Sequence, residues 1–144
     1  MNWIIEIAND KSLQSELQSF CTNYGTEELK HALKLYIDMN QKYICKTKSS
    51  ISKICITDIY YLTIQEHDIS VHTKNNVYHK YGTLNKELKF LAKYNFLKCN
   101  QSCIVSLDKI EHVIGNNLIL IDGSRLYMSR NYTGKILYEL SKNR

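Results

Sequence analysis

Proline is absent from this 144-residue chain, so one common signal of a linker between domains is missing. Long hydrophobic runs are missing too. The apolar run from Ile59 to Ile64 is far too short to span a bilayer. The segment Trp3-Ile4-Ile5 is interrupted by Glu6, and no signal-peptide pattern follows it. We therefore expect a cytoplasmic protein that has no membrane partner.

Close pairs of cysteines with the spacing of metal ligands are also lacking. The chain has five cysteines, an odd number, at Cys21, Cys45, Cys55, Cys99 and Cys103. This usage argues for reduced thiols rather than a disulfide framework. We expect most of these residues to be small, buried and apolar. No metal site and no cofactor are predicted.

Catalytic signatures cannot be assembled from the residues that are present. No Ser-His-Asp, Cys-His, paired-carboxylate or phosphate-loop signature can be assembled from the sequence without an arbitrary choice of residues. The chain is therefore predicted not to be an enzyme, and no catalytic residue is proposed.

The chain has enough apolar residues for a core and an uneven distribution of charge. Hydrophobic residues make up 44%, which suits one globular domain with a small extension. Residues 1–45 hold four lysines and six acidic residues, whereas residues 46–144 hold fifteen lysines and arginines and eight acidic residues. A basic body with an acidic extension suits a domain that binds a polyanion.

Residues 1–42 are predicted to form a helical hairpin. Asp10 or Ser12 can cap the first helix, and Thr26 can cap the second, whose first turn carries two acidic residues. Each helix shows one apolar stripe at helical spacing, formed in the first by Leu13, Leu17, Phe20 and Cys21 and in the second by Leu29, Ala32, Leu33, Tyr36 and Ile37. These stripes must be buried on each other, on the rest of the chain or on a partner. The sequence leaves these alternatives open.

From Tyr43 onward the pattern is typical of β-strands. Ile69 and Val71 alternate with polar residues, as in a half-buried strand. Hairpin turns are predicted at Asn75-Asn76 and at Asp122-Gly123. Thr83 should cap a helix, 103–106 should form a short strand with one helical turn after it, and 131–140 should form the last helix.

Three segments of the second half resemble a known family. They are the basic segment HKYGTLNKELKFLAKY, the run NFLKCNQSCIVSLDKIEHV (Asn95 to Val113), and the strand-turn-strand ending in LYMSRNYTGK. Their order and spacing are similar to those of the LytTR DNA-binding domain, the output module of many bacterial response regulators, over roughly Tyr43 to Leu140. The resemblance implies a mainly β fold with short helices, in which residues 43–144 form an elongated antiparallel LytTR-like β-fold after the helical hairpin.

In the LytTR family, side chains on loops at one side of the sheet approach the base edges of double-stranded DNA. Carried over residue by residue, the resemblance implies base contacts from His67, Asn100, Gln101 and Arg130. Arginine can bond to guanine through two hydrogen bonds, and an amide can do the same with adenine. Phosphate contacts, which position a protein without specifying sequence, are implied for Lys98, Ser102, Asn131 and Lys135.

Each of these residues also has an explanation without DNA. A histidine on a loop, such as His67, is often only solvated. Asn100 and Gln101 could be turn residues that make local hydrogen bonds. Arg130 could cap the preceding strand or pair with Glu139.

The resemblance implies a sequence-specific transcriptional regulator that reads a short, repeated site. Residues 1–42 would then mediate homodimerisation or dock a regulatory protein. Residues 1–45 are too short for a phosphorylatable receiver domain, so phosphorelay control through this chain is not expected. The alternative is a protein-interaction module that keeps the scaffold and titrates a regulator, with weak or no DNA binding. The acidic extension supports it, as do the neutral residues Asn100 and Gln101, where the family commonly has a basic residue.

Overall fold

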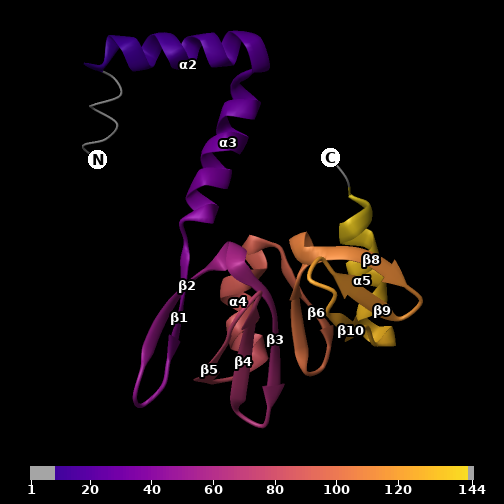
Figure 1. Cartoon of the computed structure of the whole chain (residues 1–144). Helices are drawn as coiled ribbons and strands as arrows, with labels where there is room; N and C mark the ends of the chain where they lie inside the picture. Colours follow the sequence, from indigo (N-terminus) through magenta and orange to yellow (C-terminus); the bar gives the residue numbers. More distant parts are fainter. Residues whose placement is uncertain (1–8, 143–144) are drawn as a thin grey trace. The chain divides into compact units, whose positions relative to one another are not determined.

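The structure, a computed structural model, describes residues 9–142. The apolar segment at residues 3–5 lies outside this range. The chain divides into two compact units, Met1–Asn40 and Gln41–Arg144, which are drawn in Figure 1. Among residues 9–142, no helix is long and apolar enough to cross a membrane.

The first unit contains helices α2 (Lys11–Tyr24) and α3 (Thr26–Met39). Asp10 caps α2, as predicted, and its side chain accepts a hydrogen bond of 2.9 Å from Leu13 N. The prediction that Thr26 caps α3 is wrong by one residue. Gly25 occupies the capping position, because its carbonyl accepts the bond from Leu29 N (3.3 Å). Its φ of +92° allows the chain to end one helix and begin the next.

The apolar stripes of these helices are only partly covered within their own unit. No residue of α2 is fully buried, and Leu13, Leu17 and Phe20 are half-buried. On α3, Tyr36 is 68% exposed and Ile37 is 55% exposed. The predicted stripes exist, but the two helices do not bury them on each other.

The second unit is built from three antiparallel sheets (Figure 1). One sheet is the hairpin of β1 (Lys42–Lys46) and β2 (Ile51–Cys55). The central sheet has the order β5-β4-β3-β7-β6, and the third has the order β10-β9-β8. The remaining strands are β3 (Ile59–Gln65), β4 (Asp68–Thr73), β5 (Val77–Tyr81), β6 (Phe96–Asn100), β7 (Cys103–Ser106), β8 (Ile110–Ile114), β9 (Asn117–Leu120) and β10 (Arg125–Tyr127). The predicted antiparallel fold is confirmed.

Short helices and turns connect these strands. The longer helices are α4 (Leu84–Leu91) and α5 (Arg130–Ser141), and single 3-10 turns occupy Ile56–Asp58, Ala92–Tyr94 and Leu107–Lys109. Thr83 caps α4 as predicted, since its hydroxyl accepts a bond from Lys86 N at 3.3 Å. Both predicted hairpin turns are confirmed, between β4 and β5 and between β9 and β10.

Two hydrophobic clusters lie on opposite faces of the central sheet. One packs this sheet against the β1–β2 hairpin and α4, and the other packs it against β8–β10 and α5. In β7, Ile104 belongs to the first cluster, whereas Cys103 and Val105 belong to the second. Successive side chains of a strand point to opposite faces, which explains why all of β7 is buried.

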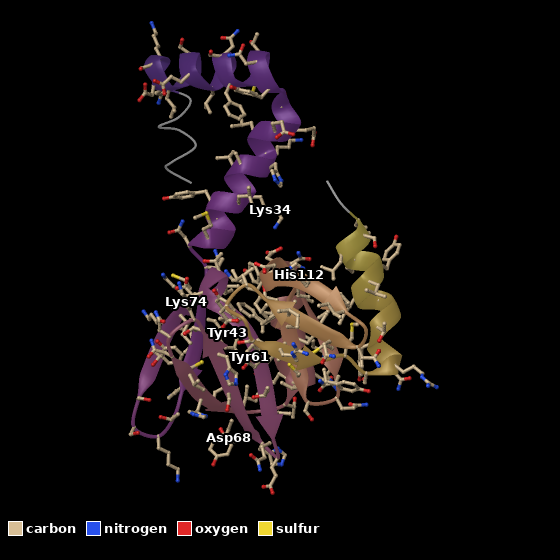
Figure 2. The ribbon with its side chains drawn as sticks, turned by 45° about the vertical axis from the view of Figure 1, so that its right-hand side comes forward. Lys34, Tyr43, Tyr61, Asp68, Lys74 and His112 are labelled. Carbon is tan, nitrogen blue, oxygen red and sulfur yellow. The ribbon has the colours of Figure 1, made fainter. Side chains whose placement is uncertain are left out.

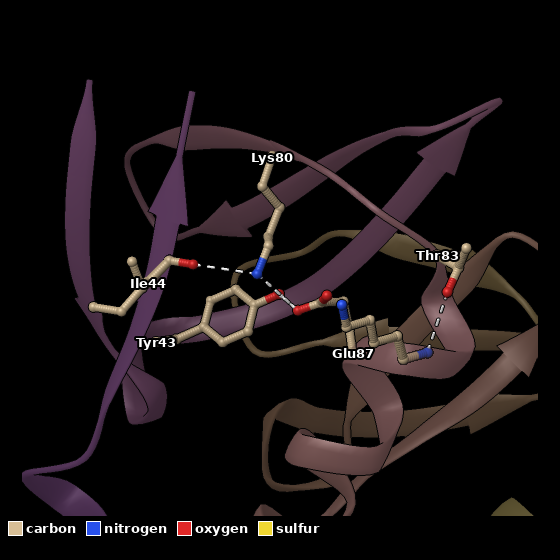
Figure 3. A network of polar contacts seen from close by, with 6 residues as sticks. Tyr43, Ile44, Lys80, Thr83 and Glu87 are labelled. Atoms are coloured by element: carbon tan, nitrogen blue, oxygen red, sulfur yellow. Dashed lines mark hydrogen bonds and ion pairs between the residues drawn. The ribbon is translucent and has the colours of Figure 1, made fainter. Parts of the chain in front are cut away.

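A polar network fastens the first hairpin to the central sheet (Figure 3). Glu87 of α4 is buried, and its Oε1 accepts hydrogen bonds from the Tyr43 hydroxyl (2.5 Å) and from Lys80 Nζ (2.9 Å). Lys80 Nζ also donates to the carbonyl of Ile44 at 3.3 Å. The Glu87 carboxylate, the Tyr43 hydroxyl, the Lys80 ammonium and the Ile44 carbonyl therefore satisfy one another's hydrogen bonds at a site largely shielded from solvent.

The second face of the central sheet is polar where it reaches β4 and β5. His72 stacks on Tyr61, with 4.1 Å between ring centroids, and its Nε2 lies 3.2 Å from the Thr63 hydroxyl. His79 lies 3.5 Å from the carboxylate of Asp68. Burial, and to a lesser extent the nearby His79, lowers the pKa of His72 below the ordinary value for histidine. Protonation of His72 is therefore disfavoured in the folded chain.

Candidate nucleic-acid interface

The turn between β3 and β4 presents His67 to solvent. Only two residues, Glu66 and His67, separate the strands, and Glu66 has a φ of +59°, in the left-handed region. The carbonyl of His67 accepts a bond of 3.0 Å from Gly82 N, which ties the turn to the end of β5. The backbone is therefore fixed while the imidazole is exposed.

The turn between β6 and β7 presents Gln101 and Ser102. Asn100, the last residue of β6, accepts a hydrogen bond of 2.8 Å from Ser102 N through its Oδ1. This side-chain bond closes the turn in the way that asparagine often does. The carbonyl of Ser102 in turn accepts a bond of 3.0 Å from Ile64 N of β3. Gln101 is exposed, and within the described chain its side chain makes no hydrogen bond.

Arg130 is the first residue of α5, and hydrogen bonds place this helix beside β6. Ser129 N donates to the carbonyl of Cys99 at 2.9 Å, and Asn100 Nδ2 donates to the carbonyl of Tyr127 at 2.8 Å. The Arg130 side chain is exposed. Among the described residues, Glu139 pairs with Lys142 and not with Arg130.

These three elements meet at one end of the central sheet. Thr63 is opposite Cys103, and Asn100 is opposite the same residue, so the turns β3–β4 and β6–β7 lie at the same end. Adjacent strands are spaced by about 4.8 Å, which places the centres of the two turns about 10 Å apart. In Figure 2, Asp68 marks this end of β4 and Lys74 marks the opposite end. His67, Gln101 and Arg130 thus come together from distant parts of the sequence.

The residues predicted to contact phosphate surround this end of the sheet. Ser102 is exposed in the β6–β7 turn, and Asn131 and Lys135 are exposed one turn apart on α5. Lys98 is half-buried in β6, opposite Ile104, so it lies on the sheet face that packs against α4. Among the four predicted phosphate contacts, Lys98 therefore lies on the face of the sheet opposite to α5.

A β-bulge in β6 could not be seen in the sequence. Lys98 is opposite Ile104, but Asn100 rather than Cys99 is opposite Cys103, so the register shifts by one residue. A bulge of this kind leaves two successive side chains opposite one partner and re-aims them. It explains why Cys99 is buried in the second cluster while the amide of Asn100 also reaches Tyr127 on that side.

The cysteine next to this turn is not available to solvent. Cys99 is 0% exposed and Cys103 is 3% exposed, and both belong to the second hydrophobic cluster. The hydrogen bond with Cys99, together with burial, raises the pKa of the Cys103 thiol. Cys103 is therefore a protonated core residue, in line with the expectation that the cysteines act mainly as small apolar residues.

Comparison with a solved structure gives the same fold. The LytTr DNA-binding domain of a Bacillus cereus protein superposes with a TM-score of 0.61, covering 72% of this chain and 99% of that one. The two sequences are 18% identical. At this level of identity, the likeness concerns the fold alone.

Sequence comparison supplies the family. Over 80 residues the chain is 34% identical to the sensory transduction protein LytT of Enterococcus faecalis, with 52% of this chain covered. The match spans 33% of that relative, so the chain corresponds to about a third of its length. Residues 49–140 match the family described as the LytTr DNA-binding domain. This segment contains His67, Gln101 and Arg130, and the chain belongs to the LytTr DNA-binding domain family.

Proposed function

We propose that this chain is a transcriptional regulator that binds double-stranded DNA sequence-specifically through the end of the central sheet that carries His67, Gln101 and Arg130. One observation carries the proposal. Strand register and hydrogen bonds gather three exposed polar side chains, from positions far apart in the sequence, at one end of the central sheet. Members of this family are binding domains and not enzymes.

Each side chain of this end has chemistry suited to a base edge. The guanidinium of Arg130 can donate two hydrogen bonds to O6 and N7 of guanine, and the amide of Gln101 can bond to N6 and N7 of adenine. His67 would reach a separate base pair, because its turn lies about 10 Å from the turn of Gln101. Ser102, Asn131, Lys135 and Lys98 would hold the phosphates on either side.

The charge of the second half supports the same proposal. Residues 46–144 carry a net charge of +7 from the counts of lysine, arginine and acidic residues. Lysines that neutralise phosphates release counterions, so binding should weaken steeply as salt increases. One copy reaches only a short half-site, and we expect a repeated site occupied by two copies.

Selection of DNA from a random pool by the full chain tests this function. We expect enrichment of a spaced repeat, with a dissociation constant that rises with salt and stays far higher on unselected DNA. Binding of equal strength to all sequences would refute the specific contacts. No binding at low salt would refute the function as a whole.

A second candidate function is a protein-interaction module, and the exposed apolar side chains of α3 favour it. Tyr36 and Ile37 lie on the predicted stripe and are exposed within their own unit. For the first function, we propose that residues 1–42 mediate self-association or dock a regulatory protein while residues 43–144 bind DNA. For the second, the scaffold titrates a regulator and binds DNA weakly or not at all. If the pool selection yields no repeat, the titrating module becomes the leading function.

A further inference from the structure

Asn100 differs from the other residues implied to contact bases, because both ends of its amide are already bonded within the protein. Its Oδ1 accepts from Ser102 N and its Nδ2 donates to the carbonyl of Tyr127, each at 2.8 Å. His67, Gln101 and Arg130 are exposed, whereas Asn100 is half-buried. A base contact from Asn100 would have to use the second lone pair of Oδ1 or the second N–H of Nδ2, on an amide whose orientation these two bonds already fix.

The two bonds of Asn100 join the two elements that carry base-reading side chains. One bond closes the turn that presents Gln101, and the other reaches the segment that leads into Arg130. The bond from Ser129 N to Cys99 O (2.9 Å) runs beside it, so β6 and the residues before α5 are tied at two places. The bulge in β6 turns the Asn100 side chain toward this segment.

We infer that Asn100 is a positioning residue, which holds Gln101 and Arg130 at a fixed separation so that they read two base positions together. The inference rests on the proposed function, and it assigns Asn100 no contact with DNA. Groups that are held in their bound geometry lose less conformational entropy on binding, so a rigid pair binds its site more tightly than two independent side chains. Only a side chain with both an acceptor and a donor can make this connection, which asparagine provides.

The inference predicts a specific pattern of coupling in DNA binding by the full chain. Asn100→Ala should reduce the preference at two base positions, those affected by Gln101→Ala and by Arg130→Ala. In a double-mutant cycle with Arg130→Ala, the effects should be non-additive by about threefold or more in Kd. Circular dichroism and thermal melting verify that each variant is folded.

A matched pair of variants distinguishes the hydrogen bond from Asn100 to Tyr127 from the bond that closes the turn and from a change of charge alone. Asn100→Asp keeps the oxygen that accepts from Ser102 N, but it places a second oxygen against the Tyr127 carbonyl. Gln101→Glu adds the same charge one residue away and breaks no hydrogen bond within the described chain. We expect both variants to weaken binding, and only Asn100→Asp to lower the preference at the base position read by Arg130.

The outcomes distinguish this inference from the proposed function. If the unaltered chain selects a DNA site, but Asn100→Ala changes one base position only and is additive with Arg130→Ala, then Asn100 contacts a base directly and the inference is wrong. The inference is also wrong if Asn100→Asp leaves the base position of Arg130 unchanged. If the unaltered chain selects no site, the proposed function itself fails.

Discussion

Lys80 Nζ lies 2.9 Å from Glu87 Oε1, and both side chains are largely removed from solvent, with 19% and 10% of their surfaces exposed. The Tyr43 hydroxyl donates to the same carboxylate oxygen. Burial and the hydrogen bond to Glu87 raise the pKa of Tyr43 far above its usual range, so the phenol remains a donor. The carboxylate is therefore stabilised by one charge and one hydroxyl from two different strands.

Loss of the charge should cost more stability than loss of the hydroxyl. Lys80→Met leaves a buried carboxylate without a counter-charge, and we expect a loss of about 3 kcal/mol in the free energy of unfolding. Tyr43→Phe keeps the ion pair and should cost about 1–2 kcal/mol. Urea denaturation measures both values.

Two further variants test the cause of this difference. Glu87→Gln, added to Lys80→Met, should recover part of the loss, because a neutral amide can still accept from Tyr43 and needs no counter-charge. Lys86→Met, on the exposed surface of α4, should change stability little. Equal losses from Lys80→Met and Lys86→Met would show that the buried pair has no special role.

Arg130→Ala and Lys135→Ala should weaken DNA binding in different ways. Arg130→Ala should cost about 1–3 kcal/mol on the selected site and flatten the preference at one base position. Lys135→Ala should weaken binding to all sequences about equally and reduce the salt slope by about one. The difference arises because a guanidinium reads a base edge through two bonds, whereas an ammonium beside phosphate responds to charge.

His67→Ala and Lys93→Ala complete this set of variants. His67→Ala should flatten the preference at a base position separate from that of Arg130. Lys93 lies before β6, at the other end of the central sheet, so its removal should leave the salt slope unchanged. An unchanged site preference in folded Arg130→Ala would count against the whole interface and favour the interaction module.

Stability should fall as the solution becomes acidic, in part because of His72. The pKa of His72 is lowered in the folded chain, so the unfolded chain binds this proton more tightly. Its contribution is complete above the ordinary histidine pKa of about 6.5 and is lost as pH falls through the lowered value. His72→Phe keeps an aromatic ring against Tyr61 but cannot titrate, so its free energy of unfolding should fall less between pH 7.5 and pH 5.

Self-association should depend on the apolar stripe of α3. A fragment that starts at Gln41 should keep DNA binding by a single copy and lose self-association, measured by analytical ultracentrifugation. In the full chain, Tyr36→Ser with Ile37→Ser should have the same effect, whereas Leu35→Ser, which lies off the stripe, should not. A folded fragment without any affinity for DNA would show that residues 1–40 belong to the interface.

The sequence predicted those parts of the fold that depend on local residue patterns. Thr83 caps its helix because a threonine hydroxyl can accept from the first turn, and Ile69 and Val71 are buried because alternation places them on one face. The residue pattern predicts the N-terminal cap of α3 at Thr26, whereas Gly25 both ends one helix and begins the next. Such a double role depends on a left-handed φ, which the sequence suggests but does not determine.

The parts that were missed depend on pairing between distant residues. The bulge at Cys99 exists only because β6 pairs with β7 in a shifted register. Tyr43, Lys80 and Glu87 meet only after three elements have packed together. The resemblance named Asn100 as a residue of the interface, but the direction of its amide follows from that bulge and could not be read from the residue type.

The placement of Tyr43 has a consequence for where a minimal domain can begin. The family match starts at residue 49, inside the turn of the first hairpin, and so omits β1. A fragment cut there would lose Tyr43 and Cys45 from the core and the carbonyl partner of Lys80 at Ile44, and it would uncover β2. Gln41 still contributes, because its carbonyl accepts a bond from Ile56 N at 3.1 Å. We therefore expect a stable fragment to begin at Gln41 or earlier, eight residues before the start of the sequence match.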